Sequence, residues 1–205
     1  MARFFDVHPS DPQPRAITQV VAMLRAGAVI AYPTDSMYAL GTRMDDHEGA
    51  ERIRALRGVD DTHQFTLVCA DFAQLGQLVT LSNTAFRAIK AATPGPYTFI
   101  LPATPEVPRR LAHPKKRSVG VRITEHPVAQ AILRELGEPL LSSSLLMPGA
   151  DWPMTEGWQI KEELDDRLDA VVDGGDCGTT PTTVVDWTDG EPEVVRVGAG
   201  DPARF

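Results

Sequence analysis

Cysteine is scarce in this sequence, and no stretch of it stays apolar for long. The two cysteines, Cys69 and Cys177, stand far apart, without another Cys or His at the spacing of metal ligands. We therefore expect neither a disulfide framework nor a zinc site, and both cysteines should be small buried hydrophobic residues. No run approaches the ~18 apolar residues of a membrane span, and the N-terminal residues lack the pattern of a secretion signal. The sequence predicts a cytoplasmic protein with no membrane partner.

Positive charge is also in short supply. The 20 Lys and Arg residues are outnumbered by 28 Asp and Glu residues, which gives a formal net charge of −8. The chain as a whole therefore repels the phosphates of nucleic acid, whose binding needs clustered cations. A local basic surface is still compatible with two groups of cations. These groups are Arg43, Arg52, Arg54 and Arg57, and Arg109, Arg110, Lys115, Lys116 and Arg117.

A chain of 205 residues with 42% hydrophobic content is long enough for one sizeable core. Strands alternate with helices early in the chain, and a hairpin is predicted near its end. This order predicts an α/β fold of the mixed α+β kind. A single domain over residues 14–205 should hold a twisted sheet of parallel and antiparallel strands flanked by helices. Residues 1–13, which carry Pro9 and Pro12, are predicted to form an N-terminal arm with residues 3–7 as an edge strand.

Hydrophobic periodicity and end signals predict the individual elements. Ser82 is a predicted N-cap, and Gly27 and Gly137 are predicted helix ends. The expected helices cover residues 14 to about 26, 46–56, 72–78, 83–91, 127–136 and 160–168. The expected strands cover residues 28–32, 65–69, 97–101, 118–123, 139–141 and 170–173, with a hairpin of 184–187 and 193–197.

The chain is organised around residues 28–41, with the sequence AVIAYPTDSMYALG. The apolar run over residues 28–32 predicts a strand buried on both faces. Pro33 ends it, and Thr34, Asp35 and Ser36 follow as small polar side chains. In open α/β sheets ligands are held just beyond strand ends. The alternative is a plain turn in which the side chains of Asp35 and Ser36 form hydrogen bonds with nearby backbone groups.

Two further strand ends carry polar side chains. Arg122 lies in an otherwise apolar strand, so its guanidinium needs an anionic partner. That partner is either a structural carboxylate or, as we favour, the carboxylate or phosphate of a ligand. Ser142-Ser143-Ser144 at the next strand end form a polar cradle or serve as turn residues. No Gly-x-Ser-x-Gly elbow surrounds them, so we do not predict a serine nucleophile.

Two loops complete the set of candidates. Residues 57–64 combine Arg57, His63 and the pair Asp60-Asp61 between a helix and a strand, and they are either functional or simply a solvated charged loop. Residues 174–183 are rich in Gly and Thr but lack Gly-Lys-[Ser/Thr], so they resemble a phosphate loop only weakly.

Five motifs occur in order: YPTDSMYALG, PGPYTFIL, VGVRITEHPVAQAIL, PLLSSSLLMPG and PTTVVDWTDGEPEVVRVG. Together they resemble the YrdC/YciO family, most closely its YciO branch, from about Phe4 to the end. The resemblance implies a YrdC-like sheet around a wide concave surface. It also implies L-threonylcarbamoyladenylate synthase activity, a nucleotidyltransferase reaction of threonine, bicarbonate and ATP that serves adenosine modification in tRNA. Family members have also been described as binding double-stranded RNA through the concave face.

The resemblance carries site roles onto individual residues. The expected substrate is ATP with Mg²⁺, and no tightly bound metal or organic cofactor is expected. Threonine binding falls on Thr34, Arg122, Ser142 and Thr182, and nucleotide binding on Ser118, Ser144 and Arg196. RNA or tRNA, if bound, would contact the basic loop, namely Arg109, Arg110, Lys115, Lys116 and Arg117.

Three departures from the synthase pattern bear on catalysis. The Lys-x-Arg pair of the synthases reads Arg57-Gly58-Val59 here, and their Ser-x-Asn reads Ser144-Leu145-Leu146. Cys69 stands where many synthases have a histidine, while His63 lies in the preceding loop. Losing a cation and an amide removes several kcal/mol of transition-state stabilisation, so we expect weak activity, with Arg57 and His63 as the catalytic candidates. The alternatives are a non-catalytic double-stranded RNA- or nucleotide-binding protein, and adenylate chemistry on another amino acid.

Overall fold

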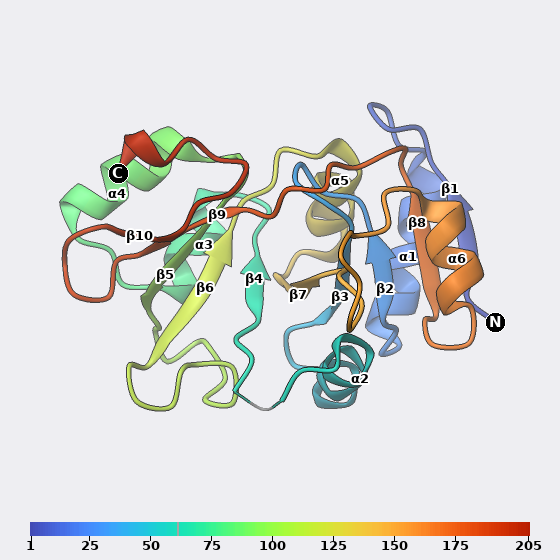
Figure 1. The fold of residues 1–205 in the computed structure, drawn as a ribbon, viewed down its shortest axis with the longest axis horizontal. Helices are drawn as coiled ribbons and strands as arrows, with labels where there is room; N and C mark the ends of the chain where they lie inside the picture. Colours follow the sequence, from blue (N-terminus) through green and yellow to red (C-terminus); the bar gives the residue numbers. More distant parts are fainter. Residues whose placement is uncertain (61) are drawn as a thin grey trace.

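The computed structural model describes residues 1–60 and 62–205; Asp61, part of the charged loop, lies outside the described residues. Within these residues one sheet of ten strands runs in the order β1-β8-β2-β3-β7-β4-β6-β5-β9-β10, with β1 and β10 at its two edges (Figure 1). The strands are β1 (Arg3–Asp6), β2 (Ile30–Tyr32), β3 (Ala39–Arg43), β4 (Thr66–Val68), β5 (Tyr97–Pro102), β6 (Ser118–Arg122), β7 (Leu140–Ser144), β8 (Ala170–Asp173), β9 (Thr183–Asp186) and β10 (Glu193–Arg196).

The strand directions are mixed, which confirms the predicted architecture. Four neighbouring pairs are parallel, among them β1–β8 and β4–β6, and five are antiparallel, among them β3–β7 and the β9–β10 hairpin. The predicted edge strand within residues 3–7 is confirmed as β1.

Helices flank the sheet, and local end signals set several of their boundaries. The Ser82 hydroxyl accepts from the backbone N–H of Ala85 at 3.1 Å, and Gly137 ends a helix with a left-handed φ of 78°. None of the described helices is both long and apolar enough to cross a membrane. The helices are α1 (Pro14–Arg25), α2 (His47–Arg57), α3 (Phe72–Leu78), α4 (Asn83–Ala92), α5 (Pro127–Leu136) and α6 (Gly157–Leu164), followed by a 3-10 turn (Pro202–Arg204).

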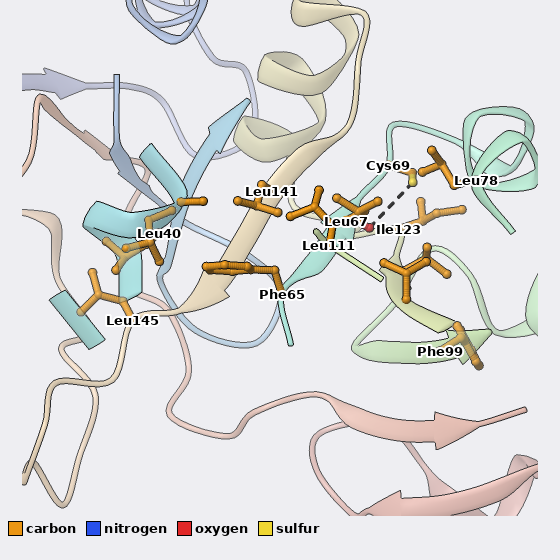
Figure 2. Packing of buried hydrophobic residues seen from close by; sticks show 14 of the residues in the cluster. Leu40, Phe65, Leu67, Cys69, Leu78, Phe99, Leu111, Ile123, Leu141 and Leu145 are labelled. Atoms are coloured by element: carbon orange, nitrogen blue, oxygen red, sulfur yellow. Dashed lines mark hydrogen bonds between the residues drawn. The ribbon is translucent and has the colours of Figure 1, made fainter. Parts of the chain in front are cut away.

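The alternation of side chains along each strand divides the core in two. Ile30 and Tyr32 of β2 pack with α1 and α5, whereas Ala31 belongs to the larger cluster that also includes buried residues of α2, α3, α4 and α6. Figure 2 shows part of this larger cluster, including Leu141 of β7 and Leu67 of β4. Strand β2 is therefore buried on both faces, as predicted.

Cysteine burial agrees with the sequence expectation at one position and differs at the other. Cys69 is fully buried, its thiol lies 3.8 Å from the Leu67 carbonyl (Figure 2), and burial raises the pKa of that thiol. Cys177 is only partly buried against the same core.

Several element assignments differ from those expected. Strand β7 extends through Ser142, Ser143 and Ser144, which were expected beyond its end at residue 141. Strand β3 was not predicted, because Ala39, Leu40 and Gly41 lack the β-branched side chains that mark a strand. Its glycine has a packing reason, since a Cβ at Gly41 would lie 2.8 Å from the Tyr32 ring on the paired strand. Helix α6 begins at Gly157 and ends at Leu164 rather than covering residues 160–168, so the preceding loop is shorter than expected.

Candidate functional site

A cavity of about 600 Å³ lies on one face of the sheet, a size typical of small-molecule sites. Alternate residues of β4, β5 and β9 face it, whereas β6 and β7 also line it with consecutive residues that include Val119 and Ser143. Val68 of β4 also touches the core under α1 and α5. The cavity therefore lies on the same face of the sheet as α1 and α5, next to the area that these two helices cover. Its lining strands contribute Thr66 and Val68, Thr98 and Ile100, Ser118, Gly120 and Arg122, Ser142 and Ser144, and Val184 and Asp186.

Arg122 reaches this cavity from the end of β6, held by a carboxylate. Its guanidinium donates to Asp35 Oδ1, which also accepts the hydroxyl of Thr124. The two charged side chains are only 8% and 6% exposed. Among the described residues, neither Arg122 Nε nor Asp35 Oδ2 has a hydrogen-bond partner. The structural carboxylate that the sequence left open is thus present, and the guanidinium keeps an unused donor.

The Pro-Thr-Asp-Ser segment after β2 is a turn closed by its threonine. The Thr34 hydroxyl donates to the Met37 carbonyl at 2.6 Å and accepts from the backbone N–H of Ser36 at 3.2 Å. Within the part of the chain that the structure describes, Thr34 is not among the residues that line the cavity. Its side chain shapes the loop that presents Asp35.

A second group of polar residues lines the cavity from β5, β10 and the segment just before β9. The hydroxyls of Thr98 and Thr182 are 2.9 Å apart, and Arg196 donates through Nε and Nη2 to the Thr182 carbonyl at 3.1 and 2.9 Å. Partial burial, and then the positive charge of Arg122, lower the pKa of Arg196. Thr182, Arg196 and Arg122 are therefore brought to one cavity, and buried Ser118 lines it beside them.

The hydroxyl of Ser142 is committed to the protein itself. It lies 2.8 Å from the hydroxyl of Tyr32 and donates to the Leu40 carbonyl at 3.0 Å. Burial raises the pKa of Tyr32 to about 12, so this phenol stays protonated at neutral pH. Ser142 lines the cavity, but its oxygen already has two partners.

Arg57 and His63 meet at a residue that we did not assign to the site, Ser143. Arg57 Nη1 donates to the Ser143 hydroxyl at 3.1 Å and also to the Ser144 carbonyl, while His63 Nε2 lies 3.2 Å from the same hydroxyl. Burial, followed by the positive charges of Arg57 and Arg54, lowers the pKa of His63. Burial also lowers the pKa of Arg57. All three side chains line the cavity and form one cluster.

The basic loop is divided by the structure. Lys116 lines the cavity and its ammonium contacts Asp186 Oδ2 at 3.2 Å. Arg110 donates to the Met44 carbonyl at 2.9 Å, and Arg109 and Arg117 line a separate hollow of about 480 Å³. Lys115 is exposed and lines neither. Of these five described cations, only Lys116 belongs to the main site.

Sequence reasoning passed over Asp35 as the partner of Arg122, and Ser143 as the partner of Arg57 and His63. Both lie inside polar clusters that it marked, so the signal was present. It also passed over two further lining residues, Asp186 and Trp152. Trp152 lies in the loop between β7 and α6, where no sequence motif marked a functional residue.

Residues 22–198 match the family model of Sua5, YciO and YrdC proteins, described as "Telomere recombination". The chain belongs to the Sua5/YciO/YrdC family. It is 47% identical to the uncharacterized protein YciO of Escherichia coli over the full length of both chains, and the E. coli YciO crystal structure superimposes with a TM-score of 0.96. These matches confirm the resemblance to the YciO branch and the predicted fold.

The Sua5/YciO/YrdC relatives with a stated activity are more distant. The threonylcarbamoyl-AMP synthase of Bacillus subtilis is 30% identical over 94% of this chain, which spans 55% of that protein. The crystal structure of P. abyssi Sua5 complexed with L-threonine is 26% identical, with a TM-score of 0.87, over 95% of this chain and 57% of the other. The chain therefore spans about half the length of these two relatives.

Proposed function

We propose that the protein is a nucleotidyltransferase that converts L-threonine, bicarbonate and ATP into threonylcarbamoyl-AMP and pyrophosphate for adenosine modification in tRNA. The observation that carries the proposal is the Arg122 guanidinium, which Asp35 fixes at the cavity wall. Synthases of the same family, and the relative complexed with L-threonine, support it.

Arg122 is the carboxylate receptor in this proposal. A guanidinium presents donors in a planar fork that matches a carboxylate, and burial strengthens such a charge-assisted pair. The Asp35 contact fixes the plane of the fork before a substrate arrives, which reduces the entropy lost on binding. Thr182, which lies beside Arg196 in the same cavity, would contact the amino acid through its hydroxyl in this proposal.

The nucleotide would contact Ser118, Ser144 and Arg196, which line the same cavity. Mg²⁺ would enter on the ATP phosphates, because this small cation is usually held by substrate phosphates and one or two carboxylates. Across residues 1–60 and 62–205 no group of three His, Cys, Asp or Glu residues forms a metal site of its own. Asp186 is a cavity carboxylate, but its oxygens already contact Lys116 and Thr188, so we do not assign it to such a cation.

The chemistry then needs positioning more than a protein nucleophile. The threonine amine and bicarbonate form a carbamate with loss of water, a carbamate oxygen attacks the α-phosphorus, and pyrophosphate leaves. Holding the two reactants together and placing cations around the developing charge are the main contributions of such a site. In this proposal the threonine ammonium first loses a proton to His63, which is neutral because its pKa is lowered, and Arg57 supplies one cation.

Release of pyrophosphate from ATP by the purified protein tests this function, with and without L-threonine and bicarbonate, alongside detection of the adenylate. We expect slow release that requires both co-substrates, and Arg122→Ala serves as the control for contaminating ATPases. Release that ignores threonine would contradict the substrate. No release with nucleotide binding intact would move the assignment to a non-catalytic protein that binds nucleotide or double-stranded RNA.

A further inference from the structure

Trp152 is the most exposed tryptophan of the chain, and it lines the cavity. Its side chain lies in the loop after β7, and 77% of the residue's surface is open to solvent. Tryptophan is a large, mostly apolar residue that proteins usually bury to a large extent. An indole left in water beside a cavity is therefore a feature that the fold itself does not explain.

The other two tryptophans provide a contrast. Trp187 is buried, and its indole N–H donates to the Gly190 carbonyl at 3.0 Å. Trp158 is 56% exposed on α6 and is not among the described residues that line the cavity. Of the three tryptophans, only Trp152 combines an exposed indole with a place among the described residues that line the cavity.

The loop that carries Trp152 adds apolar side chains and one carboxylate to a cavity that is otherwise rich in hydroxyls and cations. Leu146 and Pro153 line the cavity with Trp152, and so does Asp151. Arg122, Arg196 and Lys116 line it from β6, β10 and the loop before β6. The cavity thus offers one flat apolar surface and several cationic groups, which matches a ligand with a planar base and anionic phosphates.

We propose that Trp152 stacks on the purine base of the bound nucleotide. Each base presents a π-face, and stacking on an aromatic side chain is favourable without base-specific hydrogen bonds. The identity of the ligand as a nucleotide rests on the proposed function. The stacking role concerns binding alone, so it is tested without turnover.

Equilibrium dialysis with labelled ATP measures the affinity of four proteins: wild type, Trp152→Ala, Trp152→Phe and Trp158→Ala. We expect Trp152→Ala to weaken ATP binding by about tenfold, the loss of one base stack. Trp152→Phe should retain most of the affinity because a phenyl ring also stacks. Trp158→Ala, the matched exposed tryptophan, should bind ATP as the wild type does. Circular dichroism verifies that each variant is folded.

Intrinsic fluorescence gives the second readout. Adenosine should quench the emission of the wild type and of Trp158→Ala but not that of Trp152→Phe, and inorganic triphosphate should quench none of them. Unchanged ATP affinity in folded Trp152→Ala, or equal quenching by triphosphate, would overturn the stacking role. Absence of ATP binding by the wild type would overturn it together with the proposed function. Base-dependent quenching without pyrophosphate release would support the stacking role and reject the synthase reaction.

Discussion

Arg122 and Asp35 form a buried ion pair that joins two segments 87 positions apart in the sequence. The pair ties the turn after β2 to the end of β6 and places a guanidinium at the cavity wall. The ion pair therefore holds the turn in place and also positions the guanidinium that we propose as the recognition group.

Asp35→Ala should destabilise the protein strongly. Removing one partner of a buried pair leaves an uncompensated charge, and typical losses are about 3–5 kcal/mol. Because Arg122 also faces the cavity, where water can solvate it, we expect a loss near the lower end, about 3 kcal/mol. Urea denaturation measures the free energy of unfolding. Asp45→Ala, which breaks the more exposed pair with Arg43, is the control and should lose less than about 1 kcal/mol.

Local signals made part of the fold predictable. The bounds of α3 and α5 follow from periodicity and from the end signals beside them, such as Gly137 in its left-handed conformation. The hairpin of β9 and β10 follows from two β-rich runs around a Gly-containing turn. Such features depend on neighbouring residues, so a sequence pattern contains the information.

Features that depend on long-range contacts were harder to predict from the sequence. Strand β3 is defined by its ladders to β2 and β7 rather than by its own composition. The partner of Arg122 depends on which loop packs over β6, and several carboxylates satisfied the same sequence argument. Ser143 is a third example. Alternation along a strand predicts that its side chain faces away from those of Ser142 and Ser144, yet all three residues line the cavity.

Arg122→Ala should remove saturation by threonine from the pyrophosphate-release reaction. A charge-assisted hydrogen bond contributes about 1.5–3 kcal/mol, so losing the fork raises the KM for threonine by at least about tenfold. Ser118→Ala is the control, since Ser118 is assigned to the nucleotide and the substitution should raise the KM for ATP and leave the KM for threonine nearly unchanged. Steady-state kinetics with each substrate varied separates the two effects. Retained saturation by threonine in Arg122→Ala would reject the role of this guanidinium.

Ser142→Ala should affect stability through Tyr32. The substitution leaves a fully buried phenol hydroxyl without the partner that lies 2.8 Å away, a loss of about 1–3 kcal/mol. Tyr32→Phe should lose less, because Ser142 keeps its bond to the Leu40 carbonyl. In a double-mutant cycle read by urea denaturation, the combined variant should lose less than the sum of the single ones. Additive losses would show that the two hydroxyls do not interact.

The rate of pyrophosphate release should fall on acidification because His63 becomes protonated. Burial, then Arg57 and Arg54, lower the pKa of this imidazole below its ordinary 6.5, so it is a neutral acceptor at pH 7. The acidic limb of kcat should therefore have its midpoint below pH 6.5, with a flat profile above it. His63→Asn should lower kcat at pH 7 and remove the limb.

His126 gives the matched control, because burial lowers its pKa as well, although it caps α5 rather than lining the cavity. His126→Asn keeps a capping side chain and should retain the acidic limb in kcat. Both histidines bind a proton more readily in the unfolded chain than in the folded protein. Their contribution to the free energy of unfolding is therefore fully present above about pH 6.5, and it is lost as the pH falls toward their lowered native pKa values. His63→Asn and His126→Asn should each remove part of this loss of stability at acidic pH. A limb that persists in His63→Asn would assign it to another group and leave threonine without its proposed proton acceptor.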